Sequence, residues 1–434
     1  MMSMIKFLSI GVLFVLCSFF YFPFSFSFFP SVNTKMLLAL GGLFWLLFKY
    51  SIYKQGQIEK SFFIVTLFAT GVSFSAFLTM VLNNTLDTSY ISYVVSMWVW
   101  WGAAYFVINL IKVVHGKISV ELVCFYLIAV GVFQCLMAIA IDSFPQIKNI
   151  VNSFLYGKGY MGKVEGRLYG IGCALDVGGG RLSIVLLIIA YLLPQMVVRK
   201  RYFLTIILLI ALLMISCIGN MIGRTAVIGL FFAAAYWLYT IFINDSIYNG
   251  RKSTFVQFIL GGILIGVISS IFLYNINDYW KQLYRFGFEG FFSLVEVGRW
   301  EVHSNEMLKE GLIFPDNFKT WIIGDGYMGS PNNDPNYIGP ESWGFYMNTD
   351  AGYSRFLFYF GIIGLGAFMT FMAKVCQVCM GRFGNYKLLF LMILLTNYII
   401  WIKVSTDIFL AFAPFLCISY DENKEYEDSL KVKR

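Results

Sequence analysis

Three arginines beside glycines are the residues of this chain best suited to chemistry. Arg167 lies in the sequence EGRLYG, Arg224 in NMIGRT and Arg299 in GRW. A guanidinium keeps its proton and forms paired hydrogen bonds to phosphate oxygens, so three of them can hold a diphosphate without a metal ion. Arg224 is the strongest candidate. It lies in a connection of only a few residues between two apolar runs, where a charge is costly without a partner. For each arginine, the alternative is a snorkelling side chain or an ion pair with a carboxylate of a loop.

The sequence lacks the motifs that bind nucleotide sugars or ATP, the common activated donors of group transfer. It contains no Asp-x-Asp and no glycine-rich loop before Lys-Ser or Lys-Thr, so nucleotide sugars and ATP are poor candidates. Cys376 and Cys379 resemble half of a zinc site without a second half. We therefore expect no metal and no cofactor. A lipid-linked diphosphate sugar is the natural donor, since arginines can stabilise the charge that develops on the departing diphosphate.

The composition places these arginines in a polytopic membrane protein. Of 434 residues, 59% are hydrophobic and only 13% are charged, which excludes a soluble globular domain. Uninterrupted apolar runs predict helices rather than a barrel, and a span needs roughly 20 residues. The fold expected is all-α, with about 12 transmembrane helices and a large periplasmic loop. The runs lie at 4–22, 34–48, 61–82, 90–111, 120–141, 182–198, 202–219, 225–243, 255–276, 353–373, 388–403 and 407–420.

Basic residues predict the orientation, because cytoplasmic loops are enriched in lysine and arginine. They recur in alternate short connections, at Lys49, Lys54, Lys60, Lys112, Lys117, Arg199, Lys200, Arg201, Arg251, Lys252, Lys374, Arg382 and Lys387. Both termini are therefore predicted to be cytoplasmic, with 142–181 and 277–352 outside. The net charge of +8 fits contact with anionic membrane lipid. It does not indicate a nucleic-acid partner, since no basic stripe with interleaved aromatics lies outside the apolar runs.

No repeat or linker divides the chain, so the sequence predicts one membrane domain over 1–434. The stretch 277–352 is predicted to be an inserted periplasmic loop with short helices. Apolar spacing favours a helix over Glu301–Glu310, whereas Pro331–Pro340 is rich in turn-forming residues. The run at 4–22 is read as a retained helix, because the residues that follow it make a poor cleavage site.

Five short motifs follow one another along the chain. They are Arg167 with Gly178 after ten intervening residues, GRTA around Arg224, GRW around Arg299, GDGY with Gly324 and Gly326, and TDAGYSR with Asp350, Tyr353 and Arg355, which leads into FGIIG. In this order they resemble the O-antigen polymerase family of Gram-negative bacteria, and the resemblance in topology extends along nearly the whole chain. The second arginine motif departs from the ten-residue spacing, since Gly311 lies one residue too far from Arg299.

The resemblance implies polymerisation of undecaprenyl-diphosphate-linked oligosaccharide repeat units at the periplasmic face of the bacterial inner membrane. A chain-length regulator and a flippase of the same pathway are the implied partners. In this interpretation Arg167, Arg224 and Arg299 bind diphosphate. Asp350 or His303 orients or deprotonates the attacking hydroxyl, and Arg299 lies four residues before His303, on the same face if this stretch is helical.

Each acid–base candidate has a plainer interpretation. Asp350 could pair with Arg355 or cap the helix that begins nearby. Lone histidines such as His303 on amphipathic helices are usually packed or solvated. Gly178, Gly324, Gly326, Tyr353 and Arg355 are expected to support the site.

Two other functions stay open. An O-antigen ligase shares the architecture, the lipid donor and the arginines, but uses lipid A-core as acceptor and typically has His-Asn where this chain has Asp350-Ala351. A polysaccharide flippase or transporter would also have about twelve spans. It would be expected to carry charges within the spans and to have short loops, which this sequence does not favour.

Overall fold

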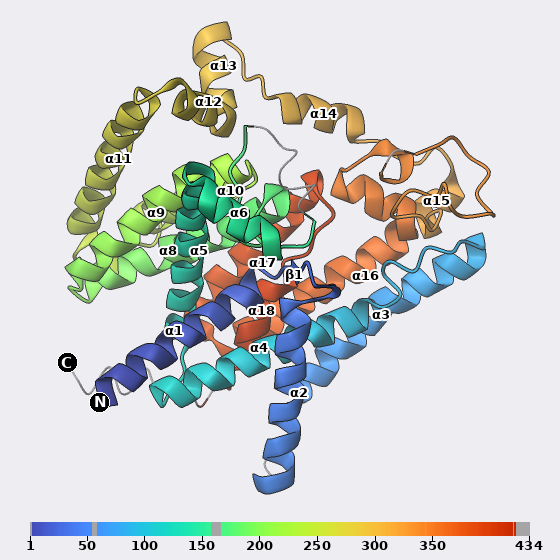
Figure 1. Cartoon of the computed structure of the whole chain (residues 1–434), viewed down its shortest axis with the longest axis horizontal. Helices are drawn as coiled ribbons and strands as arrows, with labels where there is room; N and C mark the ends of the chain where they lie inside the picture. Colours follow the sequence, from blue (N-terminus) through green and yellow to red (C-terminus); the bar gives the residue numbers. More distant parts are fainter. Residues whose placement is uncertain (1, 54–58, 158–165, 343, 420, 422–434) are drawn as a thin grey trace. The chain divides into compact units, whose positions relative to one another are not determined.

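The computed structural model describes residues 2–53, 59–157, 166–342, 344–419 and 421. The chain divides into two compact units, each built from two separate stretches (Figure 1). The first unit contains Met1–Thr34 and Ser119–Glu301, and the second contains Lys35–Ile118 and Val302–Arg434. The predicted outer loop at 277–352 is thus shared between the units, with its division between Glu301 and Val302.

The prediction of a helical, multi-pass membrane protein is confirmed. Within the described residues, ten helices are long and apolar enough to cross a membrane. Two of the twelve predicted spans are shorter. α10 has 17 residues, and the 8 residues of α18 rise only about 12 Å, less than half of a hydrocarbon core of ~30 Å. The ten helices are α1 (Met2–Tyr21), α2 (Thr34–Tyr53), α3 (Lys60–Asn83), α4 (Tyr93–His115), α5 (Val120–Ser143), α8 (Leu175–Val198), α9 (Tyr202–Ile222), α11 (Lys252–Tyr274), α16 (Gly352–Arg382) and α17 (Lys387–Lys403).

Shorter elements connect these helices. In the first unit they are β1 (Ser25–Phe26) and β2 (Phe29–Asn33), which form an antiparallel pair, and α6 (Pro145–Phe154), α10 (Ala226–Phe242), η1 (Asp245–Tyr248), α12 (Asp278–Gly287) and α13 (Glu289–Val297). In the second unit they are α14 (His303–Gly311), α15 (Phe318–Ile323), η2 (Tyr346–Asn348), η3 (Gly384–Tyr386) and α18 (Phe409–Leu416). Residues 331–340 form turns, as predicted.

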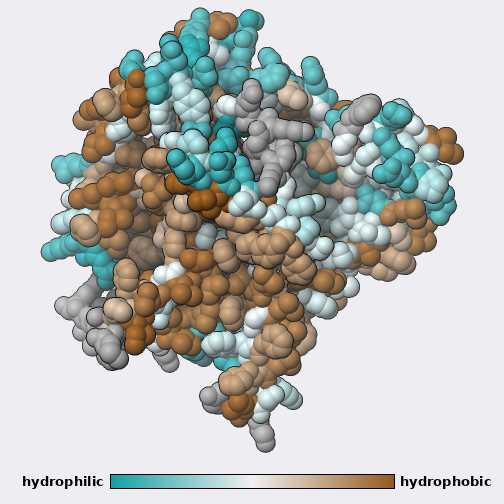
Figure 2. Space-filling model, in the orientation of Figure 1, coloured by the Kyte–Doolittle hydropathy of each residue, from teal (hydrophilic) through white to brown (hydrophobic). Residues whose placement is uncertain are grey.

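Large apolar side chains cover the outside of several spans. On α2, Leu40, Phe44 and Phe48 are all exposed, and this helix, at the bottom of the view, is largely brown in Figure 2. A helix with this surface is stable only where lipid replaces water around it. The exposed apolar surface therefore agrees with a membrane location.

In the first unit, α8 is the most buried span and packs against α5, α9 and α10 (Figure 1). Glycines let the backbones approach closely. A Cβ on Gly229 would lie 2.3 Å from the Ser183 carbonyl oxygen, and one on Gly179 would lie 2.5 Å from the Gly223 carbonyl oxygen. These contacts fix the first turns of α8 against α10 and against the turn between α9 and α10.

The two ends of the first unit carry different polar groups. At one end, Glu121 pairs with Arg199, and Arg251 donates to the Val198 carbonyl oxygen over 3.1 Å. At the other end, Tyr279 donates to Asp142. The basic residues predicted to share one side of the membrane are therefore together at one end of this unit. Which side that end faces stays a prediction.

The second unit contains a broken helix. α16 departs from helical geometry at Phe360 (φ −134°, ψ 17°) and Gly361 (φ 63°, ψ −168°). Short α15 packs beside the break (Figure 1), and Asp325 N–H and Gly326 N–H donate to the carbonyl oxygens of Phe358 and Tyr359 over 2.6 and 3.0 Å. The loop after α15 thereby satisfies carbonyls that a continuous helix would satisfy itself.

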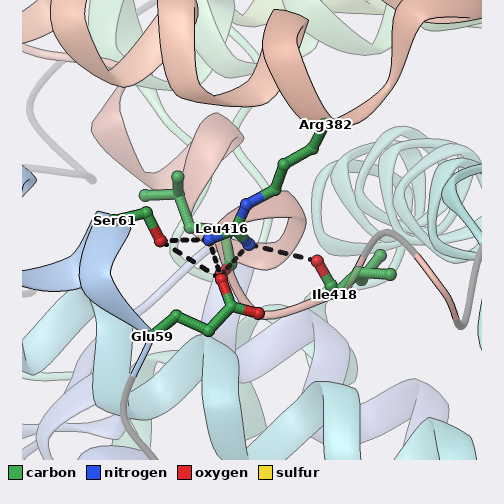
Figure 3. A network of polar contacts seen from close by, with 5 residues as sticks. All are labelled: Glu59, Ser61, Arg382, Leu416 and Ile418. Atoms are coloured by element: carbon green, nitrogen blue, oxygen red, sulfur yellow. Dashed lines mark hydrogen bonds and ion pairs between the residues drawn. The ribbon is translucent and has the colours of Figure 1, made fainter.

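Arg382 joins the ends of three helices in the second unit (Figure 3). Its guanidinium donates to the carbonyl oxygens of Leu416 and Ile418 over 2.8 and 3.1 Å, and to Ser61, and pairs with Glu59. A cation at the last carbonyls of α18 caps that helix and opposes its dipole. The network thus fixes the ends of α3, α16 and α18 together.

Candidate functional site

Arg224 lies in the short turn between α9 and α10, on a rigid part of the first unit. Gly223 before it has extended backbone, and a Cβ there would lie 2.2 Å from the Leu175 carbonyl oxygen. After it, Thr225 Oγ1 donates to the Asp176 carbonyl oxygen over 3.0 Å. The turn is therefore fastened to the start of α8 on both sides of Arg224.

Phe286 brings Arg224 and Arg167 together. The guanidinium carbons of Arg167 and Arg224 lie 4.7 and 4.8 Å from the centroid of this ring, within the range of cation–π attraction. The two charges are thus no more than about 10 Å apart. A backbone hydrogen bond of 3.1 Å from Leu168 N–H to the Met221 carbonyl oxygen holds the segment of Arg167 against the end of α9.

Arg224 also has an acidic partner. Its guanidinium forms an ion pair with Glu289 in the first turn of α13, and its side chain is only 13% exposed. This pair is the plainer alternative that the sequence left open for Arg224, so the structure does not require an anionic ligand there. The guanidiniums of Arg167 and Arg224 still meet at one ring, and positive groups gathered in this way attract anions.

Arg299 lies outside the Arg167–Phe286–Arg224 cluster in the contacts of the described residues. Its side chain is 75% exposed and pairs with Glu301 over 3.1 Å. A helical face shared with His303 was expected only if this stretch is helical, and it is not, because Gly298 at φ 74° ends α13 and α14 begins only at His303. Two of the three predicted arginines therefore lie together, and a diphosphate role for Arg299 stays a prediction.

Gly178 lies in the first turn of α8, close to the loop that precedes it. A Cβ at this position would lie 3.1 Å from Cys173 Sγ. Gly178 N–H donates to the Ala174 carbonyl oxygen over 2.9 Å. Its small size lets residues 170–174 fold over the start of α8, which is a supporting role.

Asp350 and His303 belong to the second unit and lie at opposite ends of α14. The Asp350 carboxylate is near Gly311, since a Cβ on Gly311 would lie 3.8 Å from Asp350 Oδ1. His303 is the first residue of this helix, which puts the two α-carbons of His303 and Gly311 about 12 Å apart. The two candidates are therefore alternatives rather than partners in one proton transfer.

Arg355 has structural partners of its own. It donates to Ser405 Oγ over 2.7 Å and to the Met328 carbonyl oxygen over 3.0 Å, and it stacks 3.7 Å from the centroid of Phe345. Asp350 is exposed, and α16 begins after Ala351 without a side-chain cap. Asp350 thus does not cap α16, but its charge acts on Arg355, so the interpretation as a partner of Arg355 stays open and its catalytic role stays a prediction.

Gly324 and Gly326 lie in the loop after α15, where this loop packs against the break in α16; we call this contact the joint. Both have positive φ, of 73° and 83°, and a Cβ on Gly324 would lie 2.5 Å from the Tyr359 carbonyl oxygen. Between them, Asp325 accepts hydrogen bonds from Thr320 Oγ1 over 2.6 Å and from the Tyr346 hydroxyl over 3.1 Å. Nearby in the second unit, Tyr353 donates to the Tyr398 carbonyl oxygen over 2.9 Å. These residues position backbone in the second unit, and their support of a catalytic site stays a prediction.

A tyrosine cluster covers the outside of this joint. The ring centroids of Tyr327 and Tyr346 are 5.4 Å apart, and the Tyr327 hydroxyl donates to Asp334 over 3.2 Å. Burial raises the pKa of Tyr327 to about 12, and the charge of Asp334 and their hydrogen bond add to this effect. Burial also tends to raise the pKa of Asp334, but hydrogen bonds from the N–H groups of Asn336 and Leu86 and from Tyr327 outweigh it and lower this pKa.

Phe286 and Glu289 were missed by the sequence analysis. Both lie in the segment where α12 and α13 meet, and nothing local indicates that their partners lie more than fifty residues earlier in the chain. Within the residues that the structure describes, no group of three or more His, Cys, Asp or Glu is arranged to hold a metal ion. No family model, no curated protein and no solved structure matches this chain.

Proposed function

We propose that the chain is a lipid-diphosphate-dependent glycosyltransferase, an O-antigen polymerase of the bacterial inner membrane with both termini in the cytoplasm. It joins undecaprenyl-diphosphate-linked oligosaccharide repeat units at the periplasmic face. The observation that carries the proposal is the approach of Arg167 and Arg224 to one aromatic ring at one end of a membrane-spanning bundle. Two fixed guanidiniums beside an apolar surface suit a ligand with a diphosphate head and a polyprenyl tail.

The reaction is a displacement at an anomeric carbon. A hydroxyl oxygen of the non-reducing sugar of a new unit attacks the anomeric carbon that joins the growing chain to its lipid diphosphate. The bond from that carbon to the diphosphate oxygen breaks, and its electron pair leaves with the diphosphate. The hydroxyl proton passes to a base, for which Asp350 stays the prediction. The products are a chain longer by one unit on the acceptor lipid and free undecaprenyl diphosphate.

Arg167 and Arg224 would act on the leaving group. Negative charge on the diphosphate grows as the bond breaks, and positive groups already fixed in place stabilise that charge without reorganising. The packing of Gly223 against Leu175 supplies such fixation for Arg224. Binding the departing charge more tightly than the ground state is what accelerates the step.

Deleting the gene and separating lipopolysaccharide by gel electrophoresis tests the function. A polymerase leaves a core that bears a single repeat unit. A ligase leaves a bare core, with long chains retained on the carrier lipid, and a flippase leaves no repeat units at the outer face. Either of the last two outcomes would contradict the proposal.

A further inference from the structure

The ion pair between Arg224 and Glu289 connects a tightly packed part of the first unit with a part that has few buried side chains. Arg224 is carried by the turn that glycine packing fastens to α8. Glu289 is carried by what we call the α11–α13 arm, residues 252–297. Within this arm, few side chains of the described residues are buried: Phe255 and Gly262 in α11, Leu283 and Tyr284 in α12, and Gly290 in α13.

α13, the last helix of this arm, is held to the rest of the unit by little apolar burial. In α13, Phe291, Leu294 and Val295 are all exposed. Elements with few buried apolar contacts open at a small fraction of the free energy of global unfolding. The link between α13 and Arg224 thus depends heavily on the charge pair, with Phe286 just before it in α12.

A carboxylate and a phosphate group meet a guanidinium in the same way. Each presents two oxygens, and both form charge-assisted hydrogen bonds with it. A diphosphate carries more negative charge than one carboxylate, and it can meet Arg167 as well as Arg224 across the Phe286 ring. It therefore competes well for the position that Glu289 occupies.

We propose that Glu289 is an internal counter-ion, which holds the phosphate position of Arg224 until the diphosphate of a substrate displaces it and releases α13. This inference rests on the proposed function, because it requires that Arg224 binds diphosphate. If diphosphate binds only molecules in which the pair is broken, the apparent affinity is the intrinsic affinity multiplied by the fraction of such molecules. Anions of low charge are thereby kept from the site, while a diphosphate opens it.

Binding of inorganic diphosphate to the full-length protein tests the competition. The protein is placed in nanodiscs of zwitterionic lipid, in buffer with a chelator, and binding is followed by calorimetry. We expect Glu289→Gln to bind diphosphate roughly tenfold more tightly than the wild type, a change of about 1.4 kcal/mol. Glu296→Gln is the matched control, because Glu296 pairs with Arg285 within the same arm and its loss changes the net charge equally.

Hydrogen exchange of the α13 backbone tests the release. We expect diphosphate to speed exchange over 289–297 in the wild type, and Glu289→Gln to speed it without ligand. Arg224→Ala should also speed exchange, and by at least as much, because it removes the contact with Phe286 as well as the pair. Glu289→Gln should add little in the Arg224→Ala background, because the pair is already broken there. A full additional effect of Glu289→Gln in that background would show that Glu289 stabilises α13 independently of Arg224, and would overturn the proposal.

The outcomes separate this inference from the proposed function. If diphosphate binds and Arg224→Ala abolishes binding, but Glu289→Gln changes neither affinity nor exchange, the counter-ion is wrong and the function stands. If no variant binds diphosphate, the proposed function fails and the counter-ion fails with it.

Discussion

Arg167 and Arg224 are far apart in the chain, yet their guanidinium carbons lie 4.7 and 4.8 Å from the centroid of the same ring, that of Phe286. Like charges in such proximity repel one another. The aromatic face and the carboxylate of Glu289 offset this repulsion. Two like charges held beside one ring are a site that an anionic ligand can stabilise.

Removing the Phe286 ring should weaken diphosphate binding. We expect Phe286→Leu to reduce the affinity for inorganic diphosphate about five- to thirtyfold, since the ring makes two cation–π contacts of about 0.5–1 kcal/mol each. Phe286→Tyr should retain most of the affinity. Phe291→Leu, on the exposed face of α13, serves as the control, and an equal loss there would argue against a specific role for Phe286.

The arginines should differ in how strongly their loss affects chain length. Arg224→Ala should abolish long chains on a lipopolysaccharide gel, and Arg224→Lys should rescue them only in part, because an ammonium lacks the paired donors of a guanidinium. Arg299→Ala should have a milder effect, since that side chain is 75% exposed. A normal ladder from Arg224→Ala at normal expression would remove Arg224 from the site.

The glycine joint in the second unit should be intolerant of a side chain. Gly361 has φ 63° and ψ −168°, a region open essentially to glycine only, and a Cβ there would lie 2.3 Å from the Ile322 carbonyl oxygen. Gly361→Ala should destabilise the protein by about 2 kcal/mol or more, seen as a lower midpoint of thermal unfolding. Gly366→Ala is the control in the same helix, because a Cβ there meets nothing within 4 Å. Equal midpoints for both variants would show that the joint is not fixed as described.

Alkaline titration should test the tyrosine cluster. The pKa of Tyr327 is raised from 10.0 to about 12 in the folded protein, first by burial and then by Asp334. A raised pKa contributes stability that is fully present below the unfolded value of 10.0 and is lost as the pH rises through the folded value. Tyr327→Phe should therefore lose less stability than the wild type between pH 10 and 12, measured by thermal unfolding. Identical losses in the two proteins would contradict the raised pKa.

Substitution of the two acid–base candidates should affect chain elongation to different degrees. Because Asp350 and His303 lie at opposite ends of α14, they are not interchangeable. Asp350→Asn should reduce chain elongation at least about a hundredfold, in line with the loss of a general base. His303→Gln should leave most activity. The reverse order of effects would assign the base to His303.

The membrane helices could be predicted from the sequence because an apolar run of sufficient length has one solution in lipid, a helix. The break in α16 was not predicted, since it depends on the docking of the end of α15 against Gly361, a contact between distant segments. The end of α13 at Gly298 has a local cause, a glycine in left-handed conformation, and this end separates Arg299 from the helix of His303.

Of the residues in the candidate site, only the arginines could be predicted from the sequence. Arg167 and Arg224 attract notice as charges at the ends of apolar runs. Phe286 and Glu289 are ordinary members of short amphipathic helices, and only the folded path of α11 to α13 brings them to Arg224. Partners at such a distance in sequence leave no local pattern, so the ion pair that neutralises Arg224 had to be found in the structure.

The most direct test is a reaction with defined components. Purified protein in nanodiscs is given undecaprenyl-diphosphate-linked repeat units as both donor and acceptor, with a chelator present, and the products are separated by length. The account predicts chains of two or more units, release of one undecaprenyl diphosphate for each new bond, and loss of both products in Arg224→Ala. Elongation by Arg224→Ala at the wild-type rate, or no elongation by the wild type while the carrier lipid is intact, would contradict it.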